Sequence, residues 1–281
     1  MATEAFLAVL LGALLHASWN AAIKAGRDKL MDAVLVTSGA ALLSLLAVPF
    51  LPFPAAASWP YLAASIAIHV VYFALVVAAY RAGDMSHAYP LMRGTGPLIV
   101  ALLSGLVLGE HLPAPAWIGV GLICGSILGM MLASPARGPP SGAATGFALL
   151  NAGIIAAYTF VDGAGVRLSG HAVAYTMWVF IGTALPLLAF AAARRPADLA
   201  AAVRRRSAVA LGGGACSLGS YALALWAMTE APIAAVAALR ESSILFALAI
   251  GALVLKEPLR PARLVAGLGI ALGVAVLRLA S

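Results

Sequence analysis

Apolar stretches of about 20 residues recur from one end of the chain to the other, with short polar connections between them. An α-helix of that length crosses the hydrocarbon core of a bilayer, which is about 30 Å thick. Membrane-spanning strands would be about ten residues long and would alternate polar and apolar positions, a pattern that we do not find. The sequence therefore predicts an all-α integral membrane protein with ten transmembrane helices. The predicted spans are residues 4–24, 31–51, 60–80, 87–108, 115–133, 144–162, 171–193, 208–228, 232–254 and 262–280.

The composition excludes a soluble fold. Of the 281 residues, 63% are hydrophobic and 10% are charged, whereas soluble domains carry about 25% charged residues. The net charge of +7 comes mostly from basic residues between the apolar stretches, so we expect membrane lipid as a partner and no nucleic acid. The first stretch carries Glu4 and lacks a basic segment, which indicates a retained span and not a cleaved signal peptide. We expect a multi-pass protein of the plasma membrane.

Neither cysteine suggests a metal site. Cys124 and Cys216 lie far apart, each within an apolar stretch, and neither has the spacing of a metal ligand. We therefore expect no cofactor.

The two halves of the sequence resemble each other. The segment "LMRGTGPLIVALLSGLVLGEHL" (91–112) aligns with "ALRESSILFALAIGALVLKEPL" (238–259), and an arginine and a glutamate coincide at the same offset of 147 residues (91 to 238). We interpret this as an internal repeat. The Pro-, Gly- and Ser-rich stretch 134–145 separates the two copies, which we expect at 1–135 and 143–281.

Each copy holds five predicted spans. Because five is odd, the second copy enters the membrane from the opposite side, and the sequence predicts two inverted five-helix repeats. Inverted repeats are typical of transporters, in which the substrate site lies between the halves near the middle of the bilayer.

The chain resembles the EamA family of the drug/metabolite transporter superfamily. The resemblance rests on five plus five spans, an arginine early in the fourth and ninth, and the closing motifs "LGE" (108–110) and "LKE" (255–257). It covers essentially the whole chain, and the arginine-to-glutamate block is its most specific part. It implies a ten-helix fold and the export or exchange of small metabolites, amino acids or drugs, without naming a substrate.

The basic residues also predict an orientation. Connections after odd-numbered spans hold thirteen of the 17 Lys and Arg residues, whereas the opposite side holds Arg167 and Arg278. Because Lys and Arg accumulate on the cytoplasmic side, we expect the odd-numbered connections in the cytoplasm and both termini outside.

Arg93 in the fourth span corresponds to Arg240 in the ninth. An arginine inside a span costs about 2.5–3.5 kcal/mol to insert and should face protein or water. Two interpretations stay open. The guanidinium suits a substrate carboxylate or phosphate. Alternatively, each arginine fixes helix packing, which its occurrence in both halves favours because a substrate is not symmetric.

The glutamates of the repeat suggest a structural role. Glu110 corresponds to Glu257, and each lies where its span meets a short connection. We expect both to brace the turn between two helices.

One face of the first span is polar. His16, Trp19 and Asn20 are spaced i, i+3 and i+4, and Lys24 follows one turn later. This face either lines a cavity or forms a hydrogen-bonded packing seam. His16 is also a candidate for proton coupling.

Glu241 is a carboxylate well inside a predicted span, followed by Ser242 and Ser243. A group of this kind suits proton coupling. The alternative is a salt bridge to Lys24, Arg93 or another cation.

Aromatic residues are further candidates for the substrate site. Tyr72 and Tyr221 come first because the repeat aligns them, and packing is the alternative role for each. The others are Tyr80, Tyr89, Tyr158 and Trp226.

The fourth span contains helix-weakening residues on both sides of its arginine. We expect Pro90, Gly94, Gly96 and Pro97 to loosen this helix. Irregular backbone in a membrane must face protein or a wet cavity, so a loosened helix would indicate the transport site.

Two spans carry faces of small residues. They are Gly121, Gly125 and Gly129 in the fifth span and Gly269 and Gly273 in the tenth. Such faces allow close helix packing, within one chain or in a homodimer.

No ATPase phosphate loop and no HExxH or GxSxG motif occurs in the sequence. We expect a secondary transporter, not an enzyme, that exports small metabolites, amino acids or drug-like solutes by alternating access. The alternatives are a flippase for a lipid-linked group, or an intramembrane enzyme or assembly factor. The candidate substrate-binding residues are Arg93, Arg240, Glu241, Ser242, His16, Asn20, Tyr72 and Tyr221.

Overall fold

The structure is a computed structural model that describes residues 1–26, 28–132, 141–256 and 260–280. Within these ranges, ten helical segments are long and apolar enough to cross a membrane, so the predicted all-α fold with ten spans is confirmed. The ninth span consists of two consecutive helices, α9 and α10. The helices are α1 (Thr3–Lys24), α2 (Lys29–Ala47), α3 (Trp59–Ala82), α4 (Met85–Leu108), α5 (Ala114–Leu132), α6 (Gly142–Ser169), α7 (Ala172–Arg194), α8 (Pro196–Glu230), α9 (Ile233–Arg240), α10 (Ser243–Leu253) and α11 (Pro261–Leu279), with 3₁₀ turns η1 (Val48–Phe50) and η2 (Ala56–Ser58) between α2 and α3.

Local sequence sets several helix ends. Asp28 and Asp84 cap α2 and α4, and their carboxylates accept hydrogen bonds from the backbone N–H of Met31 and Ser86. At the other end of α4, Gly109 has a φ of 68°, a left-handed conformation that glycine adopts without a steric penalty. The chain therefore leaves α4 in a tight turn that begins at Glu110.

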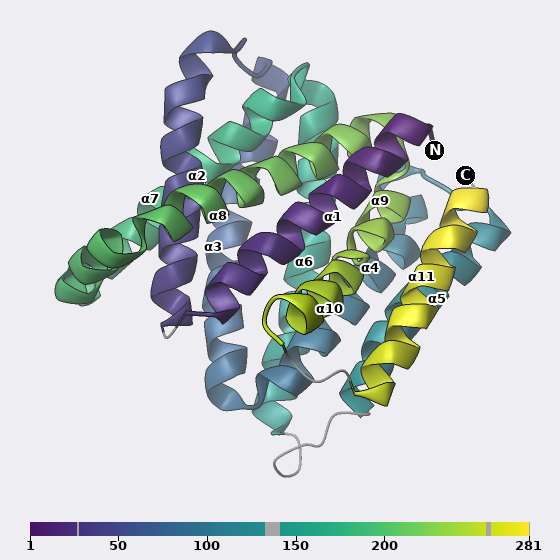
Figure 1. Ribbon diagram of the computed structural model, residues 1–281. Helices are drawn as coiled ribbons and strands as arrows, with labels where there is room; N and C mark the ends of the chain where they lie inside the picture. Colours follow the sequence, from purple (N-terminus) through teal and green to yellow (C-terminus); the bar gives the residue numbers. More distant parts are fainter. Residues whose placement is uncertain (27, 133–140, 257–259, 281) are drawn as a thin grey trace.

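The bundle has two ends, which we name by their connections. The odd end holds the last residues of α1, α3, α5, α7 and α10, and the even end holds the first residues of α1 and the last residues of α2, α4, α6, α8 and α11 (Figure 1). Arg278 near the C-terminus donates a hydrogen bond of 2.8 Å to the carbonyl of Met1. Eleven of the thirteen cations in the positive-inside count belong to the described residues, and they lie towards the odd end.

The two halves pack against each other in a reciprocal way. Helix α1 packs on α8 as α6 packs on α3, and α4 packs on α6 as α10 packs on α1. The equivalent helices α5 and α11 lie side by side at the edge of the bundle (Figure 1). Exchanging the halves thus reproduces these pairings, as expected for two inverted repeats.

The prediction that the fourth span is loosened is wrong. Helix α4 is continuous through Pro90 and Pro97, because α5, α6 and α9 pack along it and a proline removes only one backbone hydrogen bond. The break lies in the ninth span instead. There the N–H groups of Glu241 and Ser242 bond to carbonyls three residues earlier, which makes a tight turn between α9 and α10.

Two other elements are longer than expected. Helix α6 continues past the predicted end at residue 162 to Ser169. The stretch 193–206, predicted as a polar connection, is helical from Pro196 and joins the eighth span at a kink at Arg206.

Helices α2 and α8 cross unusually closely. A Cβ on Gly39 would collide with the carbonyl oxygen of Ala210, and a Cβ on Gly214 would lie 2.5 Å from the backbone nitrogen of Ala40. Backbone atoms cannot yield as a side chain can, so this crossing requires glycine.

We therefore expect Gly39→Ala to destabilise the protein by about 1–3 kcal/mol, the usual cost of overpacking. The control is Gly153→Ala in α6, where an added Cβ meets nothing within 4 Å. The measurement is the melting temperature of the purified protein in detergent. Equal melting temperatures for the two variants would contradict the close crossing.

Candidate functional site

A central cavity lies between the two halves of the bundle. Its volume is about 140 Å³, enough to hold several water molecules. It receives residues from α1, α2, α3, α4, α6, α7, α8 and α9. Its lining residues are His16, Trp19, Asn20, Ala33, Val36, Thr37, His69, Tyr72, Phe73, Tyr89, Arg93, Tyr158, Val179, Phe180, Thr183, Ser217, Ser220, Tyr221 and Arg240.

The lining residues from α1, α2 and α4 lie between the middle of the bundle and its odd end, whereas those from α7 and α8 lie at the middle or slightly past it. Helix α1 contributes residues from its second half, such as Asn20, and α2 contributes residues from its first half, such as Thr37. Likewise, α4 contributes Tyr89 and Arg93 near its start. Because these parts of the helices are the ones nearest the odd-end connections, the cavity extends towards that end.

At the even end, a set of contacts that we call the even-end brace joins the two halves. The Glu110 carboxylate pairs with Arg167 at 2.6 Å and accepts a hydrogen bond of 2.8 Å from the backbone N–H of Ile233. Arg167 also donates to the carbonyls of Met228 and Ala231 at 2.8 and 3.1 Å. The brace therefore joins the end of α4 in the first half to α6, α8 and α9 in the second.

The expectation that Glu110 braces a helix-to-helix turn agrees with this arrangement, although its partners come from the other half. Its repeat equivalent, Glu257, lies outside the described residues.

The two repeated arginines both line the cavity, but their surroundings differ. Arg93 Nε lies 2.9 Å from Glu241 Oε2, and Arg93 Nη2 donates to Ser243 Oγ at 3.5 Å. Glu241 is 3% exposed. The alternative of a salt bridge between Glu241 and Arg93 is thus the arrangement present, and it joins the halves at the turn that breaks the ninth span.

Arg240 instead lies over an aromatic ring. Its guanidinium carbon is 5.3 Å from the centroid of the Tyr221 ring, a cation–π contact. The hydroxyl of Tyr221 donates a hydrogen bond of 2.5 Å to Asp162.

Asp162 is a buried carboxylate that the sequence patterns did not single out. It is fully buried in α6, and its second oxygen accepts a hydrogen bond of 3.0 Å from the Tyr175 hydroxyl. Within the described residues, no cation lies within salt-bridge distance of it. Two tyrosine hydroxyls from α7 and α8 therefore satisfy this carboxylate and fix the ring of Tyr221 below Arg240.

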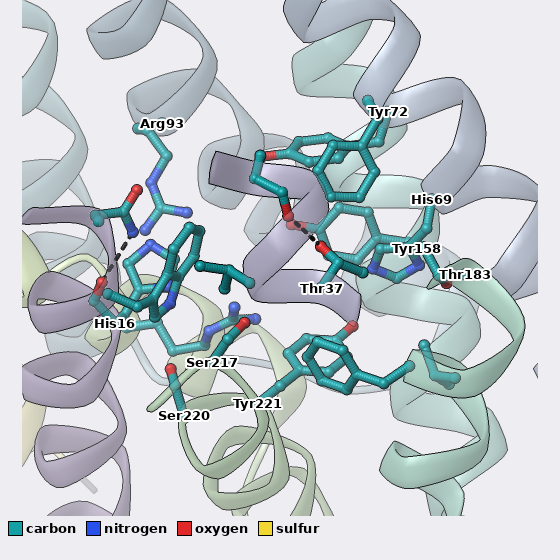
Figure 2. Close-up of a pocket in the computed structure, with 18 of the residues that line it drawn as sticks. His16, Thr37, His69, Tyr72, Arg93, Tyr158, Thr183, Ser217, Ser220 and Tyr221 are labelled. Atoms are coloured by element: carbon teal, nitrogen blue, oxygen red, sulfur yellow. Dashed lines mark hydrogen bonds between the residues drawn. The ribbon is translucent and has the colours of Figure 1, made fainter. Parts of the chain in front are cut away.

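One wall of the cavity is aromatic. The His69 ring stacks on Tyr158 with centroids 4.6 Å apart, and Tyr72 and Tyr221 present edges to this pair. Figure 2 shows Tyr72, Tyr158 and His69 on one side of the cavity, and Arg93 and His16 on the other. The cavity is thus apolar and aromatic on one side and more polar on the opposite side.

The polar face of α1 borders the cavity. His16, Trp19 and Asn20 line it, the rings of His16 and Trp19 meet edge to face, and the Asn20 amide donates to the His16 carbonyl at 2.8 Å. Of the two interpretations, the cavity-lining one therefore matches the position of this face.

Two predicted residues lie outside the cavity wall. Ser242 is 1% exposed, and its hydroxyl has no hydrogen-bond partner among the described residues. Glu241 lies behind Arg93, at a small neighbouring pocket. The tight turn between α9 and α10 accounts for both positions, because it directs the two side chains into the bundle.

The structure also adds cavity residues that no sequence pattern pointed to. His69 was a lone polar residue within an apolar span, and its partners come from α6 and α8. Thr37, Thr183, Ser217 and Ser220 supply hydroxyl groups. A count of polar residues inside predicted spans could have marked these positions, but not which of them face each other. Within the described ranges, no three His, Cys, Asp or Glu side chains gather as a metal site would require.

Asp162→Ala tests the tyrosine network. It would leave two tyrosine hydroxyls without their acceptor, at about 1–3 kcal/mol for each buried unsatisfied group. We expect a clearly lower melting temperature for purified Asp162→Ala, and a smaller loss for Asp162→Asn, which retains an acceptor. Replacing Tyr175 and Tyr221 by Phe in the Asp162→Ala background should recover part of the loss. An unchanged melting temperature in Asp162→Ala would contradict the network.

Comparisons with known proteins agree with the fold. The EamA-like transporter family matches the chain twice, at residues 3–132 and 143–279. A solved structure described as "Crystal structure of protein" is 18% identical, with a TM-score of 0.76 over 99% of this chain and 98% of that one, a likeness of fold alone. No curated protein matches the chain. Because the family match spans nearly the whole sequence, the chain belongs to the EamA-like transporter family, whose members are membrane transporters of small solutes.

Proposed function

We propose that this protein is a secondary transporter that exports small metabolites, amino acids or drug-like solutes across the plasma membrane by alternating access. Two observations carry the proposal: the central cavity, whose residues from α1, α2 and α4 lie towards the odd end, and the Glu110–Arg167 brace, which joins the two halves at the even end. A cavity between inverted repeats that is accessible from one side is one of the two states that alternating access requires.

The distribution of cations supplies the direction. The connections after odd-numbered spans carry thirteen of the 17 Lys and Arg residues, so the positive-inside rule places the odd end in the cytoplasm. In this state a solute enters the cavity from the cytoplasm. Export then requires the brace to open and the odd end to close.

Two ion pairs at the odd end connect helices of the two halves. Arg195 pairs with Asp28 at 2.5 Å, and Arg206 pairs with Asp32 at 2.7 Å, so α8 and its approach are attached to the start of α2. Burial would raise the pKa of Asp28, but the hydrogen bonds from Arg195 and from the backbone N–H of Met31, together with the charge of Arg195, outweigh it and lower the pKa below its ordinary value. These pairs link segments of the two halves that must move together when the odd end closes.

Access to the cavity can be measured with a thiol label. A variant with Cys124→Ala, Cys216→Ala and Ser217→Cys carries one cysteine in the cavity wall. We expect a membrane-impermeant maleimide to label it in inside-out vesicles and to label it much more slowly in right-side-out vesicles. Faster labelling from outside would contradict the proposed state and orientation.

The brace can be tested in the same vesicles. Glu110→Gln loses its charge interaction with Arg167, so we expect faster labelling of the cavity cysteine from outside. The matched control is Glu230→Gln at the same end, an exposed carboxylate whose recorded contact is with the neighbouring Thr229. If the cavity cysteine is labelled from outside at the same rate in the two variants, the brace does not control access to the cavity.

Transport itself requires reconstitution. We expect proteoliposomes to show counterflow with at least one member of a panel of amino acids, organic acids and cationic drugs. Movement of a fluorescent lipid without movement of any solute would favour the flippase alternative.

A further inference from the structure

The two repeated arginines are not equivalent in charge. Arg93 is paired with Glu241 from the other half. If the symmetry were complete, Arg240 would be paired with the residue that corresponds to Glu241 in the first copy. At the offset of 147 residues that residue is Gly94 (94 to 241), which has no side chain to supply a carboxylate.

Arg240 accordingly keeps its hydrogen-bonding capacity. Among the described residues, none forms a hydrogen bond or an ion pair with its guanidinium, and its recorded contact is with the face of Tyr221. A guanidinium that rests on a ring face retains in-plane N–H groups for an oxyanion. Arg240 is only half-buried and lines the cavity, so these donors are accessible to a solute.

The charged groups around Arg240 leave its positive charge uncompensated on the side that borders the cavity. Arg93 and Glu241 compensate each other. Asp162 supplies a negative charge near Arg240, but it is fully buried and both of its oxygens accept hydrogen bonds from tyrosines. The positive group therefore borders the cavity, and the balancing negative group lies beyond the Tyr221 ring.

The rest of the wall limits the solute further. Tyr72, Phe73, Tyr158 and Phe180 offer apolar ring surface. The Thr183 hydroxyl is buried beside the cavity and has no hydrogen-bond partner among the described residues. Because an unsatisfied buried hydroxyl is costly, it is suited to a polar group of a bound solute.

We propose that Arg240 is the anion-binding group of the cavity and that the transported solute is a small organic anion. Its carboxylate or phosphate binds Arg240, and its apolar body lies against the aromatic wall. This inference rests on the proposed function, since it takes the central cavity as the transport site. Arg93 contributes to the fold through Glu241 and does not select the anion.

Four probes with the same ring but different charge test the inference. They are phenylacetate, phenyl phosphate, 2-phenylethanol and phenethylamine, titrated calorimetrically into the full-length protein in nanodiscs. We expect wild type to prefer at least one of the two anions over the alcohol and the amine. A preference for phenylacetate over phenyl phosphate, or the reverse, identifies the oxyanion.

Substitutions of Arg240 test whether this residue causes the preference for anions. We expect Arg240→Gln to weaken binding of the preferred anion roughly tenfold or more, as for a lost charged hydrogen bond, with little change for the alcohol. Arg240→Lys should restore part of the affinity. The matched control is Arg204→Gln, which removes an exposed arginine that does not line the cavity and should keep the anion preference.

The inference is overturned if wild type shows no anion preference, or if Arg240→Gln keeps it. The proposed function is tested separately by counterflow of the preferred anion in proteoliposomes. Binding that depends on Arg240 without counterflow would refute transport and leave the anion site intact. Counterflow together with an unchanged anion preference in Arg240→Gln would support transport and refute the anion site at Arg240.

Discussion

The ion pair between Arg93 and Glu241 is the interaction on which the centre of this protein depends. A charge inside a membrane bundle is costly unless it is paired, and removing one member of a buried pair typically costs about 3–5 kcal/mol. Here the pair joins the two halves, with Nε and Oε2 2.9 Å apart. The tight turn at Glu241 and Ser242 interrupts the ninth span and allows the carboxylate to reach Arg93. The same turn places Arg240 at the end of α9, beside the cavity.

An inverted repeat begins with two equal halves, whereas a solute has no such symmetry. In this chain, residues at equivalent positions of the two halves differ, and these differences make the cavity asymmetric. Glu241 compensates the arginine of the first copy, and Gly94 leaves the arginine of the second copy free of a carboxylate. The brace of Glu110 and Arg167 joins the halves at one end, and the cavity extends towards the other. The two repeats thereby place two arginines at the cavity, one paired with a carboxylate and the other in contact with an aromatic ring.

Much of the fold was predictable because membrane spans are defined by length and polarity alone. The aligned arginines and the aligned Tyr72 and Tyr221 identified helices that meet at the cavity, since a pseudo-two-fold axis brings equivalent positions near the centre. Asp162 was missed because its charge, with Arg167 five residues later, ended the predicted sixth span, whereas α6 continues to Ser169. Two tyrosines from other helices offset the cost of burying it, and local sequence cannot show such partners.

The site was less predictable than the fold for a related reason. Pro90 and Pro97 indicated an irregular fourth span, but neighbouring helices keep α4 intact, and the break occurs at Glu241, where no proline is present. Likewise, nothing in the sequence around His69 shows that its ring stacks on Tyr158. Helix periodicity places side chains on faces, but contacts between faces depend on packing over the whole chain.

The central claim is that the two ends of the bundle open alternately around one cavity. Distances between spin labels test it most directly, with one pair at Ala25 and Ser86 at the odd end and another at Ala56 and Ala114 at the even end. Measurements would be made with and without a solute that shows counterflow. We predict opposite changes on solute binding, with the odd-end distances becoming shorter and the even-end distances longer. Unchanged distances at both ends, or changes of the same sign, would contradict alternating access.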